Sequence, residues 1–532
     1  MISSTGELAS ILITALLLAC VAAWGVAWRY RAVMRRLMSA TTIRSGADGL
    51  KDAAAEPVSI DAPAPVTLAD NRRAALRLTL LLVGLSCLIA ATSASVWLLL
   101  SFPGEPFRSK RAAVLALMQL WPVVPVLGLV WHWSRWRLIG ALVLFCMVCL
   151  AVMLWRSIEV RPMEAALGLA VEVGPGFLMI AVLFMGSATR AIAPWLLPPF
   201  IGLVWASALG VDALALLVEQ RSPLLMHLPS WLDAAVVMLL FALLPWLLAA
   251  WPLRALGRAL GRAHARRQLS ELMVTFTAVW AVSQTVQAVT VASSAGWRGI
   301  AMLLPLAWIP LVVTLFAAVG ARRTGAGGRP PTLLVLRVFQ RDVQVQALFD
   351  HIVERWRLSG NTVLIAGTDL AERTLGGDDI FEFIDGRLAE RFIRSASEVG
   401  PRLAAFERLP DADGRHRINE CYCHDTTWQD ALHALVQTSD VVLMDLRGFK
   451  AHNAGCRYEL GTLARSSRPL RVIVLVDADT DRVAADAEVA GAPAGRFHWV
   501  DAARIDAGRR SAVLACLFEA PDARMRVAPI AP

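Results

Sequence analysis

The chain has 532 residues, and 57% of them are hydrophobic, a share that is too high for a purely soluble protein. Its formal net charge of +9 does not by itself indicate nucleic acid, because arginine also accumulates at the cytoplasmic ends of membrane helices. We therefore expect several membrane spans in contact with a lipid bilayer, and no nucleic-acid partner.

Nine segments are apolar enough and long enough to cross the hydrocarbon layer, which takes about 20 residues. Tryptophan stands at many of their ends, as in the aromatic belt at a membrane interface. Residues 1–320 are therefore predicted to form a transmembrane helical bundle. The nine segments are Leu8–Trp28, Leu76–Ser101, Ala113–Trp133, Leu138–Trp155, Leu167–Ser187, Ile192–Val218, Trp231–Pro252, Leu272–Val291 and Gly299–Gly320.

The basic residues predict the orientation of these spans. The first segment lacks a basic stretch before it and is followed directly by "RYRAVMRR", which indicates a retained anchor with its N-terminus outside. With that start, the inner loops hold 16 Lys and Arg, and the outer loops hold seven. Positive residues favour the inner side, and nine spans then bring the C-terminus into the cytoplasm. We expect a multi-pass protein of a bacterial inner membrane.

Few polar side chains lie inside the predicted spans. Transporters usually place ionisable groups at mid-membrane, whereas Glu172, Asp212 and Asp233 fall near span ends. Gln284 and Gln287 lie within a span, and hydrogen bonds between packed helices account for them. An anchor or sensor role is favoured over transport.

The pattern changes after "ARRTGAGGRPP" at 321–331, which is typical of a linker. Apolar, β-rich runs then alternate with amphipathic helices, which predicts an α/β domain at 332–480 with an open, mostly parallel sheet. A C-terminal extension at 481–532 is predicted to hold a short strand at 497–500 and a final helix. The other expected strands are Thr332–Phe339, Asn361–Gly367, Asp440–Leu446 and Leu470–Asp477, and the expected helices are 343–360, Ile380–Ala396, Thr427–Thr438 and Cys456–Ser467.

In sheets of this kind, ligands bind beyond the carboxyl ends of the strands. The loops that matter are therefore 340–342, 367–372 and 447–456. Arginine often binds phosphate groups, so an arginine of the first loop is a candidate for a pyrophosphate, although a solvated or membrane-facing charge explains it equally well. The candidate ligand-binding residues at this edge are Arg341, Asp369, Asp445 and Arg447.

The segment "ECYCHDTTWQD" holds a dense group of polar residues before a predicted helix. A C-x-C-H run alone lacks the second pair of ligands that structural zinc sites use, so no metal site is predicted. Asp425 or Thr426 can cap the helix that starts near Trp428. Alternatively, His424 and Asp425 lie at the mouth of the pocket and hold ribose or phosphate.

"SDVVLMDLRGFKAHNAGCRYELGTL" resembles the second conserved box of Toll/interleukin receptor (TIR) domains. In that box a Ser precedes an apolar strand, and a Glu-Leu pair follows a Cys; here they are Ser439, Cys456 and Glu459 with its neighbouring Leu. "VLRVFQRD" is similar to the first box. The resemblance covers about 332–479 and implies a flavodoxin/TIR-like sheet and self-association through this domain.

The same stretch also resembles nucleoside deoxyribosyltransferases, in which a strand, an Asp-Gly loop and a Gly-x-x-x-Glu-Leu-Gly run follow one another. In both families the Glu acts on an N-glycosidic bond, that of NAD in catalytic TIR domains and that of a nucleoside in the transferases. Both resemblances imply a catalytic role for Glu459. They disagree on the substrate: the TIR resemblance implies NAD, with no bound cofactor, and the other resemblance implies a nucleoside.

The chemistry agrees with this role for Glu459. Cleavage of an N-glycosidic bond builds positive charge on the ribose, and a carboxylate close to the anomeric carbon stabilises that charge. The sequence places Glu459 in the first turn of its helix, where the helix dipole alone also favours an acidic residue.

The leading interpretation is a membrane-anchored TIR-like signalling or defence protein that hydrolyses NAD or a related nucleotide. Two alternatives stay open. One is a non-catalytic scaffold or nucleotide-binding sensor at the membrane, and the other is a transporter with a regulatory tail.

Overall fold

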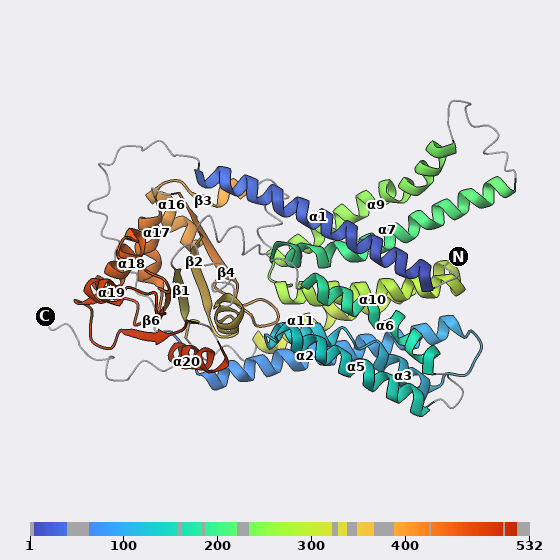
Figure 1. Ribbon diagram of the computed structural model, residues 1–532, viewed down its shortest axis with the longest axis horizontal. Coiled ribbons are helices and arrows are strands. Elements are labelled where there is room, and N and C mark those ends of the chain that lie inside the picture. The colour runs from blue at the N-terminus through green and yellow to red at the C-terminus, as the bar shows by residue number, and fades with distance from the viewer. Residues whose placement is uncertain are drawn as a thin grey trace. The chain divides into compact units, whose positions relative to one another are not determined.

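The computed structural model divides into two units (Figure 1). The helical unit lies within Met1–Arg29 and Thr79–Phe316, and the α/β unit lies within Tyr30–Leu78, Ala317–Thr374 and Asp379–Pro532. We describe each unit by itself. The residues that the structure describes are 5–39, 63–156, 162–183, 187–220, 234–321, 328–337, 348–366, 383, 388–424, 427–503 and 506–518.

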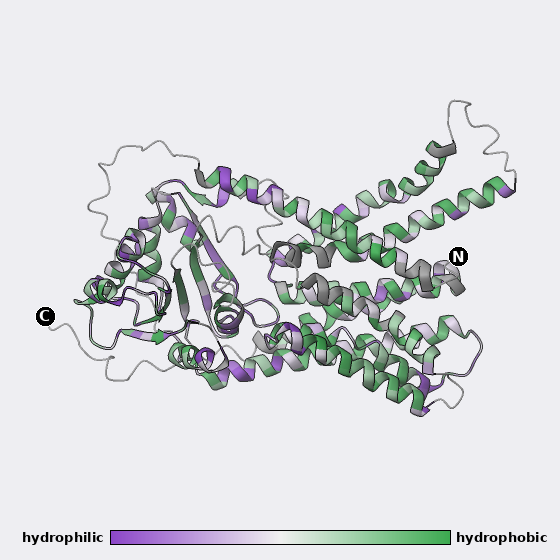
Figure 2. Ribbon diagram, in the orientation of Figure 1, coloured by the Kyte–Doolittle hydropathy of each residue, from purple (hydrophilic) through white to green (hydrophobic). Residues whose placement is uncertain are grey.

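The helical unit consists of long helices along which hydrophobic residues predominate (Figure 2). Two of these helices are shared, because the last residues of α1 and the first residues of α2 belong to the α/β unit. The helices are α1 Thr5–Ser39, α2 Leu68–Ser101, α3 Ser109–Met118, α4 Val123–Val130, α5 Arg135–Arg156, α6 Pro162–Leu183, α7 Ser187–Glu219, α9 Ala234–Ala265, α10 Glu271–Ala295, the 3-10 helix η1 Gly296–Ala307 and α11 Trp308–Ala321.

Among the described residues, seven helices are long and apolar enough to cross a membrane, or eight if the bent pair α3 and α4 forms one span. The two helices of that pair meet at 47°. The predicted count was nine, and the difference is the segment Leu167–Ser187. That segment largely overlaps α6, which is not among the seven. Several apolar spans are therefore confirmed, and the ninth stays a prediction.

Helix α10 forms the centre of the helical unit, since 78% of its most apolar stretch is buried. The Ser93 hydroxyl on α2 donates a hydrogen bond to Oε1 of Gln284 at 2.7 Å, and Nε1 of Trp280 donates to the Ser86 hydroxyl at 3.3 Å. Both bonds join α10 to α2. The packing role predicted for Gln284 is therefore confirmed.

The α/β unit is built on a seven-stranded sheet in which all neighbours are parallel, in the order β3-β4-β2-β1-β5-β6-β7. All five strands predicted from apolar runs are present, and the parallel sheet is confirmed. The strands are β1 Thr332–Arg337, β2 Asn361–Ala366, β3 Phe392–Ile393, β4 Ile418–Cys423, β5 Val441–Asp445, β6 Arg471–Val476 and β7 Phe497–Asp501.

The strands β3 and β4 were not predicted. The expected helix Ile380–Ala396 is wrong over its described end, where Leu388–Arg391 form a 3-10 turn and Phe392 pairs with Tyr422 of β4. Strand β4 lacks the apolar sequence pattern of the other strands, because its buried polar residues are hydrogen-bonded to nearby partners. Asn419, for example, accepts a hydrogen bond from the backbone N–H of Glu407 and donates one to its carbonyl.

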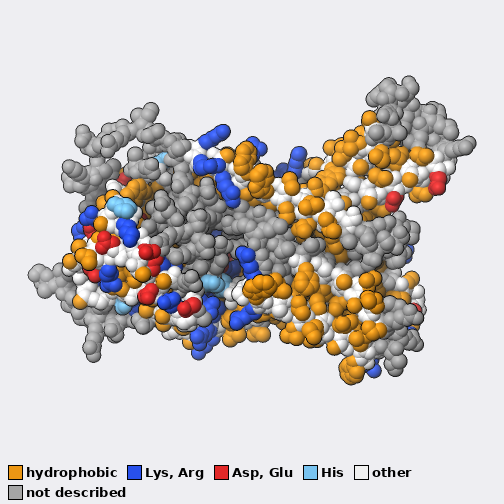
Figure 3. Space-filling view, viewed as in Figure 1, with side chains coloured by type: hydrophobic (Ala, Val, Ile, Leu, Met, Phe, Trp, Pro, Cys, Tyr) orange, Lys and Arg blue, Asp and Glu red, His pale blue; other side chains and the backbone are white. Residues whose placement is uncertain are grey.

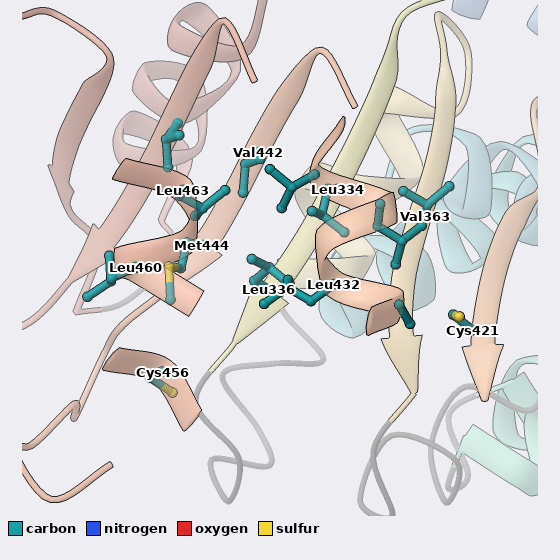
Figure 4. Packing of buried hydrophobic residues seen from close by; sticks show 14 of the residues in the cluster. Leu334, Leu336, Val363, Cys421, Leu432, Val442, Met444, Cys456, Leu460 and Leu463 are labelled. Carbon is teal, nitrogen blue, oxygen red and sulfur yellow. The ribbon is translucent and has the colours of Figure 1, made fainter. Parts of the chain in front are cut away.

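Helices cover both faces of the sheet. On one face, alternate residues of the strands pack against α17 and α18, as Figure 4 shows for Leu334, Val442 and Met444 with Leu432 and Leu460. On the other face, α20 packs near α13, with the rings of Trp356 and Phe518 5.2 Å apart. The remaining elements are the π-helical turn η2 Phe349–Val353, α13 Glu354–Trp356, the 3-10 turn η3 Leu388–Arg391, α16 Ala396–Ala404, α17 Trp428–Thr438, α18 Ala454–Arg465, α19 Arg482–Val489 and α20 Ala507–Phe518.

A buried polar network lies at the amino-terminal edge of the sheet. The Arg357 side chain is 2% exposed, pairs with Glu354 at 2.8 Å and donates from Nε to the carbonyl of His416 at 2.8 Å. Arg415 also pairs with Glu354. The His416 ring reaches Asn361 at the start of β2, with Nδ1 2.9 Å from Oδ1. The network fixes the start of β2 against the segment before β4.

His416 should make folding sensitive to acid. Burial, together with the Arg357 charge and against an opposing backbone hydrogen bond, lowers the pKa of its imidazole to about 4. Between the ordinary value near 6.5 and about 4, the unfolded chain binds a proton that the folded chain does not, so stability falls by about 1.4 kcal/mol per pH unit as the pH drops.

We expect the melting temperature of the full-length protein to fall more steeply with acidification, between pH 6.5 and 4, than that of the variant His416→Gln. The measurement is a thermal melt at half-unit pH steps for both proteins. Equal slopes would show that His416 does not titrate in this window.

Candidate active site

The strand order reverses at one point of the sheet. The chain adds β2, β3 and β4 on one side of β1 and then crosses to add β5, β6 and β7 on the other side. In open parallel sheets, ligands bind beyond the carboxyl ends of the strands where the order reverses in this way. That point lies between β1 and β5, whose last residues, Arg337 and Asp445, are partners in the register.

The loop after β5 begins with a buried ion pair. Asp445 accepts hydrogen bonds from Nε and Nη2 of Arg447 at 2.8 and 2.6 Å, and the Arg447 side chain is 1% exposed. Nη1 of Arg447 also donates to the carbonyl of Ala502, just after β7, at 3.3 Å. Both residues were predicted to bind ligand. A bidentate pair buried to this degree offers little surface to a ligand, and its geometry braces the loop against the end of β7.

Further hydrogen bonds hold the same loop in one conformation. Gly448 has a φ of +73°, which favours glycine, and its N–H donates to the Asp477 carboxylate at 2.8 Å. The Thr480 hydroxyl donates to the carbonyl of Leu446 at 3.0 Å. Sequence reasoning missed this role of Asp477, although an acidic residue directly after an apolar strand is a usable signal. The loop is therefore preorganised by the neighbouring β6 segment.

Glu459 lies on α18 and is 6% exposed. The helix begins at Ala454, two residues before the predicted start, so Glu459 is in the second turn and the first turn holds no acidic residue. The predicted first-turn position is wrong, and the helix dipole, which acts within the first turn, no longer accounts for this residue.

The burial of Glu459 follows from the face of the helix on which it lies. Cys456, Leu460 and Leu463 face the sheet, as Figure 4 shows, and Glu459 follows Cys456 by three residues, which places it on the same side. It lies nearer the start of the helix than the two leucines, and α18 starts from the loop at the carboxyl end of β5. Glu459 is therefore on the part of α18 near the edge of the sheet where β5 ends and the strand order reverses.

The pKa of the Cys456 thiol depends on its burial and on the neighbouring carboxylates. Burial, together with the negative charges of Glu459 and Asp445, raises the pKa of Cys456 to about 12. Both carboxylates therefore lie within electrostatic range of this thiol. Because the thiol stays protonated at neutral pH, a thiolate nucleophile is disfavoured here.

His424 lies at the end of β4 and is 8% exposed. Its ring packs against Phe392 with centroids 5.5 Å apart, and its backbone N–H donates to the Thr427 hydroxyl at 3.2 Å. Strands β4 and β5 are separated by three strand spacings, roughly 14 Å. The structure therefore does not bring His424 next to Glu459, and only an extended ligand could contact both.

Arg341, Asp369 and Asp425 lie outside the described residues. The cap of α17 is Thr427, whose side chain makes no capping hydrogen bond, whereas Thr426, the other predicted cap, is also outside the described residues. Within the described ranges, no group of three or more His, Cys, Asp and Glu is arranged to hold a metal ion.

Comparison with protein families, curated proteins and solved structures finds no match to this chain.

Proposed function

We propose that this protein is a membrane-anchored signalling or defence protein whose α/β domain hydrolyses the N-glycosidic bond of NAD or a related nucleotide. Glu459 is the catalytic carboxylate. The observation that carries the proposal is a glutamate that is 6% exposed, on a helix that starts from the loop at the carboxyl end of a parallel strand, and outside the first turn of that helix. The motif resemblances to TIR domains and to deoxyribosyltransferases agree on this residue.

The main requirement of this reaction is a negative charge close to the ribose. In NAD the bond between ribose C1′ and the nicotinamide nitrogen breaks, and its electron pair neutralises the pyridinium ring as nicotinamide leaves. Water adds to C1′ and releases a proton. Glu459 stabilises the positive charge that develops on the ribose, and a buried carboxylate does so more strongly than a solvated one.

The two carboxylates near Cys456 have different roles in this proposal. The charge of Asp445 is compensated by Arg447, with which it forms a bidentate pair. Asp445 therefore shapes the loop, and Glu459 acts on the substrate.

We also propose that the domain is cytoplasmic, in a bacterial inner membrane, after nine spans. Helix α6 has 22 residues and is about 33 Å long at 1.5 Å per residue, which matches a hydrocarbon core about 30 Å thick. Counting α6 supports the ninth span, and the excess of basic residues in the inner loops supports the orientation.

The substrate class can be tested with the purified full-length protein in lipid nanodiscs. We expect nicotinamide and ADP-ribose products from NAD, and no base exchange between a 2′-deoxynucleoside and a free base, both followed by liquid chromatography with mass detection. Base exchange without NAD loss would assign the site to nucleosides. Consumption of neither substrate would contradict an enzymatic role and favour a scaffold.

A further inference from the structure

Three arginines from separate segments of the α/β unit converge at the start of α2. Arg72 lies on α2, Arg355 on α13 and Arg510 on α20. Burial lowers the pKa of the Arg355 guanidinium, and the positive charges of Arg72 and Arg510 act in the same direction, so both arginines are within electrostatic range of Arg355. Figure 3 shows Lys and Arg side chains gathered over this end of α2.

Contacts of other residues hold these like charges together. Asn71 is fully buried, and its Nδ2 donates to the carbonyl of Arg355 at 2.8 Å and to the Ser359 hydroxyl at 2.7 Å. These bonds join α2, on which Arg72 is the next residue, to α13, on which Arg355 lies. The contact between the rings of Phe518 and Trp356 holds α20 against α13. The cluster is therefore built into the fold, and an anion placed among the three guanidinium groups relieves their repulsion.

The position of the cluster along α2 indicates which anion this is. Leu76 and Leu80 are 52% and 72% exposed, and Leu76 follows Arg72 by four residues, about 6 Å along the helix axis. Exposed apolar surface thus begins within about one turn of the cluster, in a helix apolar enough to cross a membrane. A phospholipid carries an anionic headgroup next to apolar acyl chains. The arginine cluster matches the headgroup, and the exposed leucines about one turn further along α2 match the acyl chains.

We propose that Arg72, Arg355 and Arg510 bind the phosphate group of an anionic phospholipid at the base of α2. The bound lipid adds a contact that joins α2, α13 and α20. This site is separate from Glu459, and the proposal rests on membrane insertion of α2 and not on any chemistry at the sheet edge.

The test compares the full-length protein in nanodiscs of phosphatidylcholine alone with nanodiscs that also contain phosphatidylglycerol. We expect phosphatidylglycerol to raise the melting temperature of the α/β unit by about 5 °C, and the triple change of Arg72, Arg355 and Arg510 to Gln to abolish this rise. The double variant Arg72→Gln with Arg510→Gln keeps the half-buried Arg355, so it separates lipid binding from folding, and it should lose most of the rise.

The matched control is the double variant Arg457→Gln with Arg482→Gln, which changes two exposed arginines in ion pairs elsewhere in the same unit and should keep the full rise. An equal rise in the wild type and in both cluster variants would overturn the proposal, as would no rise in the wild type. The same rise from inorganic phosphate in phosphatidylcholine nanodiscs would overturn the assignment to lipid.

Discussion

Replacing Glu459 with Gln is expected to lower the kcat for NAD hydrolysis by about 100- to 1,000-fold, the usual loss when one group that stabilises transition-state charge is removed. The substitution keeps the size and shape of a side chain that is 6% exposed, so folding should be retained. The carboxylate acts on charge that develops after substrate binding, so KM should change much less than kcat. Initial rates over a range of NAD concentrations measure both parameters.

Glu488→Gln is the matched control for this change. Glu488 lies on α19, next to α18, and pairs with the exposed Arg457 at 2.7 Å, so its loss should leave kcat within about twofold of the wild type. A Glu459→Gln protein that turns over NAD as fast as this control would exclude Glu459 from the reaction.

Replacing Asp445 with Asn is expected to destabilise the α/β unit by about 3–5 kcal/mol, because it leaves the Arg447 charge buried without its compensating carboxylate. At about 2–4 °C per kcal/mol for a domain of this size, the melting temperature should fall by roughly 10 °C. Cys421 and Cys456 are buried in this unit, so their labelling by a thiol-reactive fluorophore reports its unfolding in the full-length protein.

Asp486→Asn tests whether burial is the cause. Asp486 pairs with Arg482 at 2.9 Å, but both side chains are about half exposed, and such pairs contribute about 0–1 kcal/mol. A shift as small for Asp445→Asn as for this control would mean that the pair with Arg447 does not stabilise the loop. Such a result would favour the ligand-binding role predicted from the sequence for Asp445 and Arg447.

Much of the sheet could be predicted because its central strands are buried on both faces. The runs that became β1, β5 and β6 are almost purely apolar, and a parallel strand between two layers of helices needs that composition. Strand β4 lacks it, since Asn419 and Glu420 are buried among polar partners, and those partners lie at positions that a sequence pattern does not reveal.

The sequence motif selects a candidate residue, and the geometry around that residue could not be predicted. The motif drew attention to Glu459, but the start of α18 at Ala454 depends on the loop conformation fixed by Asp477 from another strand. In the same way, the spacing of Asp445 and Arg447 is compatible both with ligand binding and with the pair that they form. Only the positions of the side chains separate the two.

The central claim is that this domain cleaves the bond between nicotinamide and ribose with Glu459. The most direct measurement is nicotinamide release from NAD by the full-length protein in nanodiscs, with the wild type and Glu459→Gln side by side. We predict one nicotinamide for each NAD consumed by the wild type, and release about 100- to 1,000-fold slower by the variant. No release by the wild type, or equal release by both proteins, would contradict the claim.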